Sequence, residues 1–163
     1  MATVTSRVQP PTAMDLERFY SDLVGRRLSV KAPARLAVTP GSDFIAAVYR
    51  DETNGIAGIA CIDIPLGAAL GAALTMLPAD QAKGAATTGK FPDALWENLY
   101  EVLNITSRWF QPQTGHMVQI DPKIYRAKEL PADARAALSA TKTRFDVKAE
   151  IPGYGLGTFM LAY

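Results

Sequence analysis

Apolar residues recur at two periods along the chain, and each period predicts a different kind of element. Alternating apolar and polar residues, or short apolar runs between turn residues, are typical of strands. The predicted strands are 28–32, 35–38, 43–49, 56–64, 116–120, 124–127, 144–151 and 156–163. Apolar residues three and four positions apart predict helices. The predicted helices are 13–26, 66–77 and 92–110, with a capped helical turn at 131–140.

The order of these elements indicates the fold class. Strands that follow one another directly outnumber strands separated by helices, which favours a mixed or antiparallel sheet. The Asn54-Gly55 pair predicts a tight hairpin between two of the strands. We therefore expect an α/β (α+β) protein with two long helices packed on one face of the sheet. Residues 1–11 read as a flexible tail before a single domain at 12–163, and the small, polar segment 78–90 reads as a loop.

Composition narrows the class of protein further. The formal net charge is +1 and the 17 Lys and Arg residues are scattered, so nothing indicates nucleic acid as a partner. The most apolar region, 55–77, is interrupted by Asp63, Pro65 and glycines, which argues against a membrane span. No signal peptide is evident at the amino terminus, so a cytoplasmic protein is expected. The single cysteine, Cys61, lies in an apolar run and is expected to be a buried thiol.

Two glycines four residues apart, Gly67 and Gly71, lie on one side of the alanine-rich helix at 66–77. This spacing has two interpretations, a close contact between two helices or a face of small residues packed on a sheet. We favour packing on the sheet. The only histidine, His116, has no nucleophile motif near it and reads as a surface or loop residue.

The helix at 92–110 carries the most informative pattern. Leu95, Leu99 and Val102 begin an apolar stripe that must face the core. A polar stripe lies on the opposite side and consists of Glu97, Glu101, Asn104 and Arg108. Glutamate and arginine are ordinary on a solvated helix face. Asparagine is disfavoured in the middle of a helix, because its amide competes for backbone hydrogen bonds. Asn104 is therefore not explained by a solvated helix face alone and is a candidate functional residue.

The Glu101-x-x-Asn104 spacing on a long helix resembles the signature of the CheC/CheX/FliY family of chemotaxis phosphatases. The resemblance runs from about residue 28 to the carboxyl terminus. Glu97 stands where the family usually has Asp or Ser, and neither Pro122 nor Pro131 matches the usual spacing of a downstream proline. The helix at 66–77 has no Glu or Asn, so the resemblance implies a CheX-like protein with a single motif.

This resemblance implies a function. The expected substrate is the aspartyl phosphate of a CheY-like response regulator, with Glu101 and Asn104 as the catalytic pair. Asn104 would orient water, Glu101 would pair with a lysine of the regulator, and Glu97 and Arg108 would contact this partner. No metal ligand is expected from the chain itself, because the regulator would supply Mg²⁺.

Three functional interpretations stay open. The first is this phosphatase. The alternative is a non-catalytic CheX-like docking or scaffold domain in two-component signalling. The third is a small-ligand binder that uses the alanine-rich helix as a cavity wall. The oligomeric state also stays open, with a homodimer among the alternatives.

Overall fold

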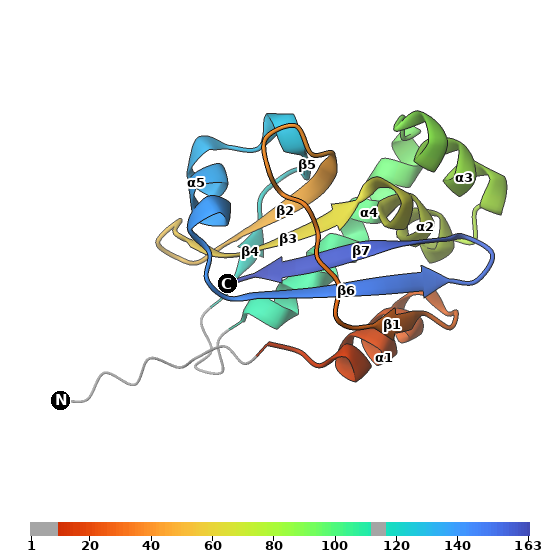
Figure 1. Cartoon of the computed structure of the whole chain (residues 1–163), viewed down its shortest axis with the longest axis horizontal. Helices are drawn as coiled ribbons and strands as arrows, with labels where there is room; N and C mark the ends of the chain where they lie inside the picture. Colours follow the sequence, from red (N-terminus) through yellow and green to blue (C-terminus); the bar gives the residue numbers. More distant parts are fainter. Residues whose placement is uncertain (1–9, 112–116) are drawn as a thin grey trace.

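The computed structural model describes residues 10–111 and 117–163, and the strands in these residues form one sheet (Figure 1). The strands are β1 (Ser29–Lys31), β2 (Phe44–Arg50), β3 (Ile56–Asp63), β4 (Gln119–Ile120), β5 (Tyr125–Arg126), β6 (Arg144–Ile151) and β7 (Gly155–Ala162). The α-helices are α1 (Ala13–Val24), α2 (Ile64–Leu74), α3 (Ala79–Thr88), α4 (Asp93–Thr106) and α5 (Ala132–Ala140). The 3-10 turns are η1 (Ser107–Phe110) and η2 (Ala127–Glu129). The predicted α+β class is confirmed.

The sheet is antiparallel throughout. Its order is β1-β6-β7-β3-β2-β4, and β5 also pairs with β2. The β2–β3 hairpin is closed by a bond from the Asp51 amide to the Gly55 carbonyl, 2.9 Å long. Asn54 takes a φ of 65° in this turn, which is the left-handed conformation expected of an Asn-Gly pair.

Both faces of the sheet are covered, which explains why six of the seven residues of β2 are buried. Alternate residues Ile45, Ala47 and Tyr49 point into a large core with α1, α2 and α4. Ala46 and Val48 point the other way, into a smaller core beneath α5. Figure 1 shows α5 and the segment 32–43 in front of the sheet, with α4 behind it. The two long helices α2 and α4 share one face, as predicted.

Segment 35–38 is not a strand, so this prediction was wrong. The Leu36 amide donates to Asp146 Oδ2 at 2.8 Å, and the Arg144 guanidinium donates to the Leu36 carbonyl at 2.7 Å. Side chains of β6 therefore occupy the backbone groups that a neighbouring strand would have paired. The buried Leu36 side chain fixes the segment across the smaller core.

The predicted loop at 78–90 is also wrong, because α3 spans most of it. Ala82 and Ala85 are buried and α3 packs against α2, so tertiary contact stabilises a helix of weak intrinsic propensity. Gly89 ends the helix in the left-handed conformation, with a φ of 71°. Most of the predicted tail, residues 1–9, lies outside the described residues.

Candidate functional site on helix α4

Helix α4 and η1 together occupy the segment predicted as one helix from 92 to 110. Pro92 is the N-cap residue, and the buried stripe contains Leu95, Leu99 and Val102, as the apolar spacing predicted. The last four residues tighten into the 3-10 turn η1. The predicted partner residue Arg108 therefore lies just beyond the α-helix.

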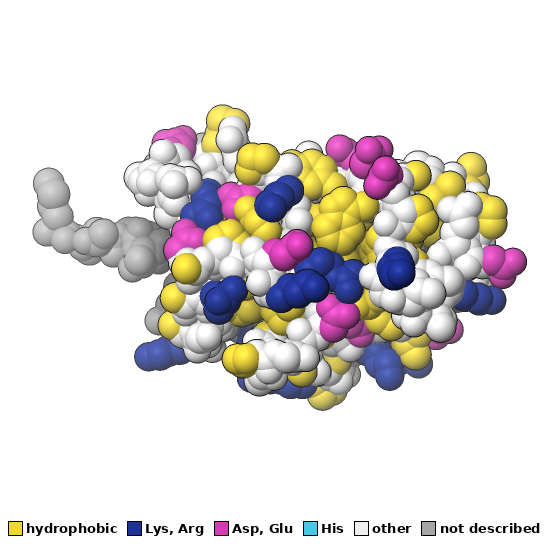
Figure 2. All heavy atoms as spheres, turned by 90° about the horizontal axis from the view of Figure 1, so that it is seen from above, with side chains coloured by type: hydrophobic (Ala, Val, Ile, Leu, Met, Phe, Trp, Pro, Cys, Tyr) yellow, Lys and Arg dark blue, Asp and Glu magenta, His cyan; other side chains and the backbone are white. Residues whose placement is uncertain are grey.

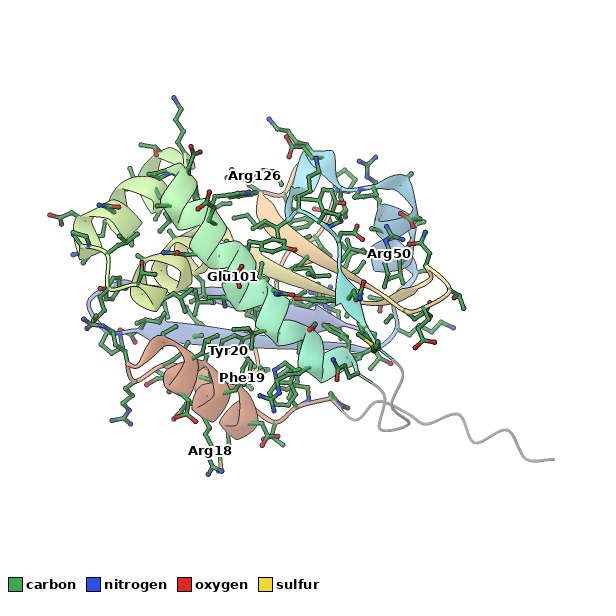
Figure 3. The ribbon with its side chains drawn as sticks, turned by 180° about the vertical axis from the view of Figure 1, so that it is seen from behind. Arg18, Phe19, Tyr20, Arg50, Glu101 and Arg126 are labelled. Atoms are coloured by element: carbon green, nitrogen blue, oxygen red, sulfur yellow. The ribbon has the colours of Figure 1, made fainter. Side chains whose placement is uncertain are left out.

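The polar stripe faces solvent. Glu97, Glu101, Asn104 and Arg108 are all exposed. Figure 3 shows Glu101 on the side of α4 that points away from the sheet. Glu101 forms no ion pair within the part of the chain that the structure describes. The structure thus brings Glu97, Glu101 and Asn104 onto one accessible face.

Two asparagines in α4 have different environments. Asn98 donates its amide to the Gly71 carbonyl at 2.9 Å and to Thr75 Oγ1 at 2.7 Å, and so links α4 to the end of α2. The Asn104 side chain makes no hydrogen bond to any described residue. Asn98 therefore has a structural reason to be asparagine, and Asn104 has none within the described fold.

The helix beneath this stripe is held by close packing. A Cβ atom at Gly71 would lie 2.7 Å from the Leu95 carbonyl oxygen, a distance that real side chains do not tolerate. Gly71 therefore marks a contact between the helices α2 and α4, and our preference for packing on the sheet was wrong at this position. Gly67 packs against both the neighbouring helix and the sheet, because a Cβ atom there would lie 3.3 Å from Leu99 of α4 and 3.4 Å from Ile45 of β2.

Buried tyrosine hydroxyls add fixed points along α4. Tyr49 donates to the Leu103 carbonyl at 2.6 Å. The hydroxyls of Tyr20 and Thr106 lie 2.7 Å apart, and Thr106 Oγ1 donates to the Val102 carbonyl, so the Tyr20 hydroxyl donates to Thr106. Burial raises the pKa of both tyrosines above the ordinary range, which keeps these donors protonated. The helix is thus positioned rigidly at both its sheet and α1 sides.

Arg108 has an intramolecular contact that sequence reasoning missed. Its guanidinium carbon lies 5.2 Å from the centre of the Phe19 ring, within the range of a cation–π contact. Phe19 also meets the Trp109 ring edge to face at 5.4 Å. Figure 3 shows Phe19 on the side of α1 that faces the end of α4. These contacts orient Arg108 at the carboxyl-terminal end of the polar stripe.

A second polar cluster surrounds Arg50 of β2. Its guanidinium binds Asp121 at 2.7 Å and Asp133 at 2.7 Å, and Asp121 also accepts a bond from the Tyr125 hydroxyl at 2.9 Å. The hydrogen bond from Arg50 lowers the pKa of Asp133. Burial first, and then the bond to Asp121, raise the pKa of Tyr125 to about 12. This cluster fastens α5 to the sheet, and its members are too far apart in sequence to form a motif.

The remaining candidates carry no site. Cys61 is fully buried as predicted, and burial raises the pKa of its thiol. His116 lies outside the described residues. In the described ranges there is no group of three His, Cys, Asp or Glu side chains that could hold a metal ion, and no helix there is long and apolar enough to cross a membrane. Gly153 and its neighbours form the β6–β7 turn.

Comparison with known proteins identifies the fold. No protein-family model matches the chain, and no curated protein matches it either. Among solved structures, FliM in a FliG–FliM complex from H. pylori is 15% identical, with a TM-score of 0.62 over 97% of this chain and 89% of that one. FliY from Thermotoga maritima is 13% identical, with a TM-score of 0.56 over 90% and 80%.

A third similar structure is the CheX–CheY–BeF3–Mg complex from Borrelia burgdorferi. It is 14% identical, with a TM-score of 0.51 over 91% of this chain and 93% of that chain. The chain therefore has the CheX/FliY/FliM type of fold, and the resemblance to this group is confirmed at the level of the fold. At such low identity the likeness does not extend to the roles of Glu101 and Asn104, which stay predictions.

Proposed function

We propose that this protein docks a phosphorylated CheY-like response regulator on the outer face of α4 and hydrolyses its aspartyl phosphate. One observation carries the proposal. Asn104 is exposed near the carboxyl end of a helix that packing and buried hydrogen bonds hold in place, and its amide has no partner among the described residues. An unpartnered amide on a rigid support is suited to orienting a water molecule.

The reaction requires little covalent chemistry from the protein. Water attacks the phosphorus in line with the aspartyl oxygen, and a new P–O bond forms while the bond to the carboxylate breaks. The products are inorganic phosphate, the free aspartate of the regulator and a proton released to solvent. Asn104 Oδ1 accepts a hydrogen bond from this water and brings no charge that would repel the phosphoryl oxygens. Mg²⁺ held by the regulator neutralises charge on those oxygens.

The neighbouring charges serve docking. Glu101 lies less than one turn from Asn104 and is free to pair with a lysine of the regulator. Glu97 extends the acidic face by one turn, and Arg108, held over the Phe19 ring, offers one positive charge at the other end. Charged groups arranged in this way fix the register of a partner more than they add affinity.

The second candidate is docking without catalysis. Glu97 stands at the position where the CheC/CheX/FliY signature has Asp or Ser. In addition, two of the similar structures are FliM bound to FliG and FliM bound to SpeE, so this fold also serves in other complexes. In this case the same polar stripe would bind a partner, and the lifetime of the phosphate would not change.

The deciding experiment measures regulator affinity and phosphate lifetime side by side, using CheY-like regulators from the same genome. A phosphatase predicts a shortened lifetime with the wild type. Asn104→Ala should then slow hydrolysis with little loss of affinity, because orienting water is a role in the transition state. Glu101→Ala should weaken binding as well.

Glu150→Ala is the matched control, since it removes an exposed carboxylate from β6 instead of α4. It should leave both quantities unchanged. If the wild type binds a regulator and leaves the phosphate lifetime unaltered across all of them, the docking function replaces the phosphatase. If no regulator binds, the phosphatase fails, and docking of a CheY-like regulator fails with it.

A further inference from the structure

A large open pocket lies away from the polar stripe. Its volume is about 990 Å³, and its wall comes from the segment 38–44, the end of α3, the start of α4, and the segment from β5 to α5. Figure 2 shows the molecule from above, with hydrophobic side chains in the middle of this face and charged side chains around them. The alanine-rich helix α2 does not line it, so this is not the cavity considered from the sequence.

One side of the pocket is aromatic. Phe91 and Trp96 are both half-buried, and their rings meet edge to face with centroids 5.8 Å apart. Leu130 at the end of η2 and Leu138 in α5 also line the pocket and add aliphatic surface. Surfaces of this kind bind planar rings, through burial of apolar area and through the preferred geometries of aromatic pairs.

The rim is basic. Three basic side chains line the pocket, Arg126, Lys128 and Arg135, against two acidic ones, Asp43 and Glu129. Arg126 is already engaged, because it donates to the Gly89 carbonyl at 2.8 Å and pairs with Asp43 at 3.1 Å. Figure 3 shows it reaching from β5 toward α4.

Arg135 differs from Arg126 in having no carboxylate partner. Its guanidinium donates one bond, 3.1 Å long, to the Leu130 carbonyl at the pocket wall and forms no ion pair with the described residues. Lys128 likewise forms no ion pair there. A guanidinium that is fixed at one nitrogen and free at the others is a ready donor to carboxylate or phosphate oxygens.

We propose that this pocket binds a small anion that carries a planar ring, with the ring against Phe91 and Trp96 and the anionic group on Arg135. The pocket volume lies at the upper end of the range found for small-molecule sites. A nucleoside monophosphate and an aromatic carboxylate share this chemistry, and the experiment below distinguishes them. The site is independent of the proposed phosphatase, because it needs no residue of the polar stripe.

The test titrates the full chain with AMP and with indole-3-carboxylate, by calorimetry and by NMR of the labelled protein. Adenosine, indole and inorganic phosphate are the matched probes, each lacking either the charge or the ring. We expect at least one ring-bearing anion to bind about tenfold more tightly than its matched probes. Its signal changes should centre on Gly89, Trp96 and Arg135.

Arg135→Gln should weaken binding about tenfold, since it removes one charge-assisted contact. Phe91→Leu, which keeps the apolar volume and removes the ring, should weaken it severalfold. Arg27→Gln is the control, because it removes an equally exposed arginine outside the pocket. The proposal is overturned if neither anion binds at millimolar concentration, if the signal changes lie elsewhere, or if Arg135→Gln binds as tightly as the wild type.

Discussion

The two asparagines of α4 provide a direct test of which side chain is structural and which is functional. Replacing Asn98 with Ala removes two hydrogen bonds, at 2.9 and 2.7 Å, each worth about 1 kcal/mol net. The same change improves helix propensity by about 0.6 kcal/mol. We therefore expect Asn98→Ala to lower the free energy of unfolding by about 1.4 kcal/mol. Asn104→Ala loses no described bond and should raise it by about 0.5 kcal/mol.

Thermal unfolding of the two variants beside the wild type measures this difference. At this chain length 1 kcal/mol shifts the melting temperature by about 2–4 °C. Asn98→Ala should therefore melt a few degrees below the wild type, and Asn104→Ala slightly above it. Below its melting temperature, Asn98→Ala should leave the lifetime of a regulator phosphate at the wild-type value. If Asn104→Ala loses as much stability as Asn98→Ala, Asn104 supports the fold and the reasoning about the site is refuted.

Two further perturbations test contacts that hold the fold together, one between α2 and α4 and one between α5 and the sheet. Gly71→Ala should lower the free energy of unfolding by about 1–3 kcal/mol, because its Cβ would lie 2.7 Å from the Leu95 carbonyl oxygen. Gly84→Ala is the control, since a Cβ there has open space, and it should raise the free energy of unfolding by about 0.5–1 kcal/mol. Chemical denaturation of both variants measures the difference. Asp133→Asn should cost at most about 1 kcal/mol at neutral pH, since the Arg50 pair is exposed on the Asp133 side. Because the pKa of Asp133 is lowered by Arg50, this contribution is complete above the ordinary aspartate pKa of about 3.9 and disappears as the pH falls through the lowered value. Urea unfolding at pH 7 and at pH 3 measures the difference in unfolding free energy between the wild type and Asp133→Asn. If this difference is the same at both pH values, the ion pair does not have this role.

Periodicity was sufficient to predict the polar stripe, because α4 is a long helix with one strongly apolar side. It could not separate Asn98 from Asn104, since both are mid-helix asparagines in sequence. The difference comes from Gly71 and Thr75, which approach Asn98 from another helix. A side chain's partner across the fold is the kind of information that a local pattern lacks.

The elements that sequence reasoning missed depend on similar long-range contacts. Segment 35–38 alternates like a strand, but its backbone is bound by Arg144 and Asp146, more than 100 residues away. Helix α3 has a glycine and two threonines and becomes a helix through the burial of Ala82 and Ala85. The pocket is lined by four segments that are separate in the sequence, so no local sequence pattern predicts it.

The central position of β7 determines when the sheet can form during synthesis. Strands β2 and β3 are joined by a short hairpin and can pair early, but β7 pairs with β3 across a separation of about 100 residues. Until β7 emerges from the ribosome, one edge of β3 has no partner strand, and the apolar faces of α2 and α4 have only part of the sheet to pack against. Because contacts so distant in sequence close slowly, a nascent chain of this protein exposes aggregation-prone surface for longer than a helical protein of the same length, and chaperone binding is expected at that stage.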